Sequence, residues 1–137
     1  MRIFIDTSTL LKKYIQEEDV DVFEGLLERS AEIVVSPVTW IEMNRAISGK
    51  LSERKVTADD AARFRFDVKR DFMYYFKALW NEALEEKALE LVCKNNLKTL
   101  DAIQLASGVL SDAEFFLTSD EKLFKEAKKV LPRVMLV

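Results

Sequence analysis

The sequence predicts an α/β fold in which helices pack against a parallel β-sheet. Short apolar runs rich in β-branched and aromatic residues alternate with longer segments whose apolar residues recur at helical spacing. Glycine and proline are scarce, at three and two in 137 residues, which argues against turn-rich all-β folds and long linkers. A chain of this length is expected to form a single domain, residues 1–137, with a substantial core.

The expected elements alternate along the chain. In order, they are a strand at 2–5, helices at about 7–13 and 19–30, a strand at 33–35, helices at about 37–48, 58–72, 82–94 and 100–110, a strand at 115–118, a helix at about 120–129 and a strand at 134–137. Strands are assigned to the short apolar runs, and helices to segments with an apolar residue every three or four positions. The aromatic stretch 73–79 has no clear period, so it is expected to be a packed connector or to extend the preceding helix.

Residues that cap helices mark most of the boundaries. Ser36 and Pro37 form an N-cap and first-turn pair, and Gly49 is expected to end the helix that they start. Thr57 and Asp60 have the spacing of a capping box. The other expected N-caps are Asn81, Thr99 and Ser119.

The residue types limit the chemistry that is available. The chain has no histidine and a single cysteine, Cys93. This excludes histidine-based acid–base catalysis, Ser-His and Cys-His nucleophiles, and zinc sites that contain histidine. One cysteine excludes an internal disulfide and fits a reducing compartment, so a cytoplasmic location is expected. Carboxylates that bind hard divalent cations are the natural remaining possibility.

Charge and hydropathy narrow the class of partner. A net charge of −3 argues against a general nucleic-acid coat protein. It does not exclude a nuclease, because seven basic residues against four acidic ones make the stretch 50–70 locally basic. No apolar run approaches the roughly 18–20 residues that span a bilayer, and the N-terminus lacks the order of a signal peptide, so no membrane association is expected.

Four acids lie where an α/β fold places its ligands. Asp6 and Asp120 each follow a predicted strand directly, and Asp101 opens the helix before a strand. Glu42 interrupts an apolar stripe on its helix. Ligands of open α/β sheets bind beyond the carboxyl ends of the strands, so these acids could converge at one edge. Taken singly, Asp6 could instead cap a helix, Glu42 could pair with Arg45, and the helix dipole would favour Asp101 regardless of function.

Converging carboxylates have a chemical consequence. Crowded carboxylates repel one another and would not all stay ionised without a cation. Mg²⁺ or Mn²⁺ resolves this repulsion by binding a few carboxylates and several waters. One such metal can activate a water nucleophile, and a second can stabilise a leaving oxygen. This chemistry suits in-line attack on a phosphodiester and requires no histidine.

Four sequence blocks resemble the PIN domain family and, within it, the VapC-type toxins of bacterial and archaeal toxin–antitoxin pairs. The blocks lie at 5–8, 36–42, 100–106 and 117–120, in the order and at the spacing of the family. The resemblance implies a three-layer α/β/α sandwich with a central parallel sheet, and a Mg²⁺- or Mn²⁺-dependent endoribonuclease. It also implies a homodimer, an RNA substrate and a cognate antitoxin that lays a segment into the active-site groove.

The resemblance also implies roles for individual residues. The family's catalytic and metal-binding quartet is matched by Asp6, Glu42, Asp101 and Asp120. Supporting hydroxyl positions are expected at Thr7, Thr118 and Ser119. Two residues depart from the pattern, because Gln104 stands where many relatives have histidine and Lys98 where many have arginine. We expect these departures to affect contacts with RNA rather than the chemistry.

Other functions remain open at this stage. A haloacid-dehalogenase-like phosphatase also has an aspartate after its first strand, but requires a second aspartate where this chain has Ser8. A receiver-type signalling domain requires a strand-borne lysine that the sequence does not supply. The alternatives to a toxin are a PIN-like module that binds RNA or protein without cutting, and an RNA-processing nuclease without an antitoxin.

Overall fold

The computed structural model describes residues 1–15, 21–30 and 32–137. Five parallel strands form one sheet in the order β3-β2-β1-β4-β5. The strands are β1 Arg2–Ile5, β2 Glu32–Val35, β3 Phe76–Lys77, β4 Phe115–Thr118 and β5 Val134–Leu136. The predicted parallel sheet is therefore confirmed, and four of its strands lie within a residue of their predicted positions.

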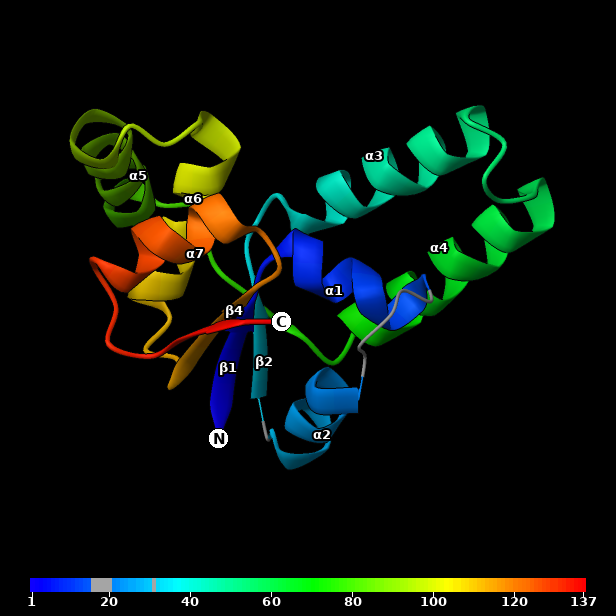
Figure 1. Cartoon of the computed structure of the whole chain (residues 1–137), viewed down its shortest axis with the longest axis horizontal. Coiled ribbons are helices and arrows are strands. Elements are labelled where there is room, and N and C mark those ends of the chain that lie inside the picture. The colour runs from blue at the N-terminus through cyan, green and yellow to red at the C-terminus, as the bar shows by residue number, and fades with distance from the viewer. Residues whose placement is uncertain (16–20, 31) are drawn as a thin grey trace.

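Helices cover both faces of the sheet (Figure 1). They are α1 Thr7–Tyr14, α2 Asp21–Arg29, α3 Thr39–Ser52, α4 Ala58–Phe72, α5 Glu82–Asn95, α6 Thr99–Leu110 and α7 Glu121–Lys128. The expected start of α2 at residue 19 lies outside the described residues. One core cluster joins a sheet face to α5, α6 and α7, and the other joins the opposite face to α1, α2, α3 and α4. The predicted three-layer α/β/α sandwich is thus confirmed.

Alternate residues of β1 divide the two cores. Phe4 points into the α5–α7 layer, whereas Ile3 and Ile5 point into the other layer. The ring of Phe4 stacks on that of Phe116, with centroids 5.2 Å apart. Gly108 of α6 lies directly on this pair, because an added Cβ would come 2.4 Å from the ring of Phe116. This close approach fixes α6, which carries part of the candidate site, against the sheet.

Helix α3 differs from its prediction at both ends. It begins at Thr39 rather than 37, because the Ser36 hydroxyl accepts a bond from the Val38 backbone N–H (3.2 Å) and forms a turn before the helix. Gly49 does not end the helix, which continues to Ser52. The chain leaves α3 at Arg54, whose φ is 58°.

Beyond Ser36, whose place as N-cap of α3 is taken by Val38, two predicted N-caps are confirmed and two are wrong. Thr57 and Asp60 form the expected capping box, and Asn81 accepts from Leu84 N–H at 2.9 Å. Thr99 lies inside α6, whose N-cap is Lys98 without a side-chain cap bond. The cap of α7 is not Ser119 but its neighbour Asp120, which accepts from the Leu123 N–H at 3.0 Å. Each error is a shift of one residue between adjacent polar side chains.

The stretch predicted as a connector contains the edge strand β3. Phe76 and Lys77 pair with Val34 and Val35 of β2, and Ala78 N–H continues the ladder to Val35 O at 2.9 Å. Both side chains of β3 are exposed. A two-residue strand with two exposed side chains has neither the length nor the alternation that a sequence pattern can reveal.

Helices α3 and α4 form a hairpin that extends from one side of the sheet (Figure 1). Arg65 of α4 ties it to α3 by donating to Asn44 Oδ1 (3.2 Å) and Ser48 Oγ (2.6 Å). None of the described helices is long and apolar enough to cross a membrane.

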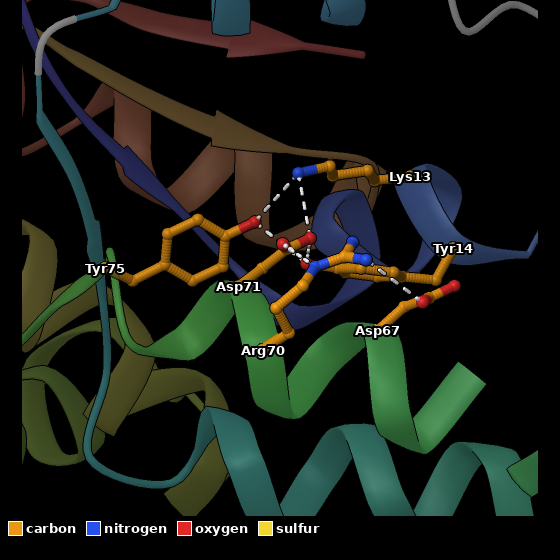
Figure 2. Close-up of polar contacts among 6 residues, drawn as sticks. All are labelled: Lys13, Tyr14, Asp67, Arg70, Asp71 and Tyr75. Carbon is orange, nitrogen blue, oxygen red and sulfur yellow. Dashed lines mark hydrogen bonds and ion pairs between the residues drawn. The ribbon is translucent and has the colours of Figure 1, made fainter. Parts of the chain in front are cut away.

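A polar cluster joins the end of α4 to the end of α1 (Figure 2). We call it the Asp71 cluster; its other members are Lys13, Tyr14, Arg70 and Tyr75. Asp71 Oδ2 accepts from Tyr14 (2.9 Å) and Lys13 (3.2 Å), and Oδ1 accepts from Arg70 (3.1 Å). The two tyrosine hydroxyls are 2.8 Å apart. The cluster therefore anchors the base of the α3–α4 hairpin to α1.

Candidate active site

All four predicted acids line one pocket of about 760 Å³. Asp6 and Asp120 lie just beyond the carboxyl ends of β1 and β4, which are adjacent strands. Glu42 comes from the first turn of α3 and Asp101 from the first turn of α6. The convergence at one sheet edge that the sequence suggested is present.

Asp6 is 3% exposed, and its donors among the described residues are all neutral. Its Oδ1 accepts from the Ser8 hydroxyl (2.7 Å) and the Thr9 backbone N–H (3.1 Å). Its Oδ2 accepts from the Thr118 hydroxyl (2.7 Å). Burial raises the pKa of Asp6 to about 6, although hydrogen bonds from Thr118, Ser8 and Thr9 oppose the rise. Asp6 therefore caps α1 and also offers a poorly compensated carboxylate to the pocket.

Thr118 links Asp6 to the second strand-end acid. Its hydroxyl accepts the Asp120 backbone N–H at 3.1 Å while donating to Asp6. Asp120 uses Oδ1 to cap α7. The Ser119 N–H donates to Ser8 Oγ (3.1 Å), and the Ser119 and Thr9 hydroxyls are 2.9 Å apart. The predicted supporting residue Thr118 thus contacts Asp6 itself, and Ser119 contacts the first turn of α1 beside it.

Asp101 is half-buried beside these groups. Burial raises its pKa, and the charge of Asp120 adds to the rise, while Lys122 and Lys98 lower it. The lysine charges do not cancel the effect of burial and of the neighbouring acid. Asp101 and Asp120 therefore form a second region of uncompensated negative charge in the pocket.

Glu42 is held by a different set of neutral donors. Its Oε1 accepts from the Thr7 hydroxyl (3.0 Å) and from Gln104 Nε2 (2.6 Å). Gln104 Nε2 also lies 2.9 Å from Thr7 Oγ1 and 3.3 Å from Thr39 Oγ1. Thr7, the third predicted supporting residue, thus joins the group around Glu42.

The described carboxylates suit a hard divalent cation. No group of three or more acids in the described part of the chain is close enough to enclose a metal ion by itself. Mg²⁺ needs no such cage, because it uses one or two carboxylates and keeps several waters. The uncompensated charge on Asp6 and Asp101 and the all-oxygen donor set fit such an ion. Histidine-free sites of this kind favour Mg²⁺ or Mn²⁺ over zinc.

The pocket has a basic end as well as an acidic one. From the acids it extends along α3 and the turn after it, where it is lined by Arg45, Gly49, Lys50, Glu53 and Lys55. Three of these residues are basic, and Glu53 forms an ion pair with Lys55 at 2.8 Å. Arg45 lies over Gly49, since a Cβ there would come 3.3 Å from its guanidinium. A negatively charged polymer could therefore meet the acids through a cation and extend along the basic side chains.

Comparison with known proteins identifies the family. The PIN domain family matches residues 3–130. The chain belongs to the PIN domain family. No curated protein matches it in sequence.

Solved structures share the fold of this PIN domain. A toxin-antitoxin complex from Klebsiella pneumoniae is 19% identical to this chain and has a TM-score of 0.69. The match covers 97% of this chain and 95% of the matched chain of the complex. VapBC2 from Rickettsia felis, bound to a promoter DNA fragment, is 12% identical to this chain and has a TM-score of 0.70. The match covers 100% of this chain and 99% of the VapBC2 chain. VapC20 from Mycobacterium tuberculosis, a sarcin-ricin loop cleaving toxin, is 15% identical to this chain and has a TM-score of 0.65. The match covers 88% of this chain and 92% of the VapC20 chain. The predicted PIN resemblance is confirmed, and the VapC likeness extends to the fold.

The structure of this PIN domain adds residues that the sequence analysis missed. Ser8, Thr9 and Thr39 bind the acids or their partners. Ser8 and Thr39 lie in the blocks 5–8 and 36–42, whereas Thr9 lies in none of the four blocks. Gln104 is 3% exposed and donates to Glu42, while its expected effect on contacts with RNA stays a prediction. One signal was available, because Gln104 is a large polar residue among the buried residues 102–108.

Proposed function

We propose that this PIN domain is a Mg²⁺- or Mn²⁺-dependent endoribonuclease and the toxin of a VapBC-type toxin–antitoxin pair. The observation that carries the proposal is the convergence of Asp6, Glu42, Asp101 and Asp120 on one pocket at the carboxyl edge of a parallel sheet. Family membership supports the same function, as do the structural neighbours, which include a toxin-antitoxin complex and a sarcin-ricin loop cleaving toxin. An antitoxin partner, a homodimer and a cytoplasmic location belong to this proposal.

One or two of the four acids would bind the cation directly, and the others would contact the water molecules that it keeps. When bound, the cation supplies Lewis-acid activation of water and neutralises charge on the phosphate. Asp6 keeps one geometry because three donors hold both of its oxygens. Glu42 is oriented by Thr7 and Gln104. Preorganised groups of this kind stabilise developing charge without reorganising during the reaction.

The basic end of the pocket would bind the rest of the substrate. Lys50 lies eight residues beyond Glu42 on α3, a distance of about 12 Å along a helix axis. Arg45 lies between them on the same pocket wall. These cations attract the phosphates that flank the reacting one, and salt weakens this attraction. The chain can therefore be acidic overall and still bind RNA.

The first test is cleavage of total RNA by the purified protein with Mn²⁺ or Mg²⁺. We expect discrete products that vanish with EDTA and fall at least about 100-fold in the Asp101→Asn variant. The matched control is Asp112→Asn, the same change at an exposed acid that does not line the pocket. It occupies φ 55°, which asparagine tolerates well.

Each outcome has a defined meaning. Loss of cleavage in Asp101→Asn but not in Asp112→Asn supports the nuclease. Metal-independent binding of RNA without cleavage would favour the non-catalytic module. Cleavage that persists in Asp101→Asn would assign the activity to a contaminant or to a different site. Co-purification of a small protein that suppresses cleavage would support the toxin–antitoxin pair, and cleavage without such a partner would favour RNA processing.

A further inference from the structure

Gln104 is a buried amide that contacts three residues on two other helices. Its Nε2 lies within hydrogen-bond distance of Glu42 on α3, Thr7 on α1 and Thr39 at the start of α3. The contact with Glu42 is the shortest, at 2.6 Å. The helix that carries Gln104 is itself fixed on the sheet through Gly108 and Phe116. Gln104 can therefore transmit a fixed position from α6 to the Glu42 carboxylate.

The bonds to Glu42 leave one of its oxygens available. Oε1 accepts both the Gln104 amide and the Thr7 hydroxyl. Among the described residues, no hydrogen bond reaches Oε2, and Glu42 lines the pocket. Both donors are neutral, so they orient the carboxylate without cancelling its charge. A lysine or arginine in the same place would hold Glu42 equally well but would repel a metal cation.

The other end of the amide reveals what sets its orientation. Gln104 Oε1 is buried and has no hydrogen-bond partner among the described residues. An orphaned buried acceptor is unfavourable by about 1–3 kcal/mol. The reverse orientation would set the amide oxygen against Glu42 Oε1 at 2.6 Å, two acceptors in contact. The observed orientation thus leaves the amide oxygen of Gln104 without a hydrogen bond, while the amide nitrogen donates to Glu42.

We propose that Gln104 is a positioning residue that holds Glu42 for a divalent cation through a neutral donor. The inference rests on the proposed metal-dependent function, but it concerns this chain's own glutamine. It predicts that losing the amide weakens metal binding even though Gln104 contributes no ligand. Outer groups that orient a metal ligand commonly change affinity by about 10–100-fold.

The test compares Gln104→Met with the wild type and with Ser107→Ala. Methionine keeps the length and unbranched shape of glutamine and removes its hydrogen bonds. Ser107 is equally buried on the same helix, but its hydroxyl donates to Ile103 O within α6 at 2.7 Å. Calorimetry with Mn²⁺ alone is expected to show affinity at least about tenfold lower for Gln104→Met and within about twofold of wild type for Ser107→Ala. Thermal unfolding in EDTA checks that both variants fold.

A second measurement separates positioning from packing. The side-chain amide resonances of Gln104 should shift when Mg²⁺ is added, with the midpoint that calorimetry with Mg²⁺ gives, and should stay still in Glu42→Gln. Wild-type affinity in folded Gln104→Met, or amide resonances that saturating Mg²⁺ leaves unmoved, would overturn the role of Gln104 alone. A wild-type protein that binds no Mn²⁺ would overturn this role together with the metal-dependent function.

Discussion

Asp6 and Asp71 lie near opposite ends of helix α1 and differ in what balances their charge. Asp6 accepts from two hydroxyls and a backbone N–H, and no lysine or arginine of the described residues pairs with it. Asp71 accepts from Lys13 and Arg70 as well as from the Tyr14 hydroxyl (Figure 2). Both carboxylates are fixed in position, but only Asp71 is neutralised.

The two environments shift the pKa values in opposite directions. Burial raises the pKa of Asp6 to about 6, and its neutral donors only reduce the rise. Burial would also raise the pKa of Asp71, but hydrogen bonds from Arg70, Tyr14 and Lys13 outweigh it and lower the pKa. Among the described residues, basic side chains thus neutralise the carboxylate of Asp71, and none neutralises that of Asp6 at the pocket. Such departures from local stability are expected at functional sites.

The largest expected effect is that of Asp6→Asn on stability in EDTA. The pKa of Asp6 in the folded protein, about 6, exceeds its ordinary value of 3.8 by about two units, or about 3 kcal/mol. The folded state therefore binds this proton more tightly than the unfolded state. The contribution of Asp6 to stability falls as pH rises from about 4 to 6 and stays low above that range. At pH 7.5, Asp6→Asn should raise the free energy of unfolding by up to about 3 kcal/mol while cleavage is lost.

Urea unfolding of both proteins between pH 4.5 and 7.5 measures this effect. The pKa of Asp101 is also raised, so its ionisation lowers stability in the same pH range. Both proteins contain Asp101, so the difference between their free energies of unfolding reports on Asp6 alone. The advantage of the variant should grow with pH and level off above 6. A difference that does not change with pH would mean that Asp6 is not destabilising in its ionised form.

Asp71→Asn should produce the opposite result. The variant leaves Lys13 and Arg70 without their shared carboxylate, so we expect a loss of about 2 kcal/mol in the free energy of unfolding at pH 7. The wild-type contribution of Asp71 is present above its unfolded pKa and is lost as pH falls through the lower folded value. RNA cleavage should stay within about twofold of wild type, because the Asp71 cluster does not line the pocket.

Asp67→Asn is the matched control for Asp71→Asn. Asp67 lies one turn earlier on α4 and contacts Arg70 at 3.4 Å near the surface. A single exposed ion pair contributes little, so the change should be below about 1 kcal/mol. Equal effects of the two substitutions would show that Asp71 acts as an ordinary surface acid and would remove the contrast with Asp6.

The same contrast explains which features the sequence could predict. The four acids were predictable because each is placed by its own local element: a strand end for Asp6 and Asp120, and a helix first turn for Glu42 and Asp101. The fold class was predictable for a similar reason, since buried strands and amphipathic helices leave local periodic patterns. Errors of one or two residues arose where adjacent polar residues compete for a cap, as Ser119 and Asp120 do.

The donors around those acids were not predictable in this way. Gln104 and Glu42 are separated by 62 residues, and Lys13 and Asp71 by 58. No periodicity or motif records such a contact, because it exists only after the layers have packed. The sequence therefore indicated which carboxylates converge on one pocket, while the structure was needed to see which carboxylates are neutralised.

The smallest expected effect comes from removing one hydroxyl group, either from the Asp71 cluster or from the hydrogen bonds around Asp6. Tyr75→Phe removes one hydrogen-bond partner each from Tyr14 and Lys13. Asp71 keeps all of its own bonds, so we expect a loss of about 1 kcal/mol in the free energy of unfolding, with no change in the pH dependence of stability. Thr118→Val is similar in shape and removes the donor to Asp6 Oδ2. A similar loss in the free energy of unfolding is expected at neutral pH. Because the pKa of Asp6 should rise further in this variant, the loss should shrink as pH falls and Asp6 becomes protonated. Urea unfolding across the same pH range distinguishes the two variants, and parallel pH profiles would mean that Thr118 does not control the charge of Asp6.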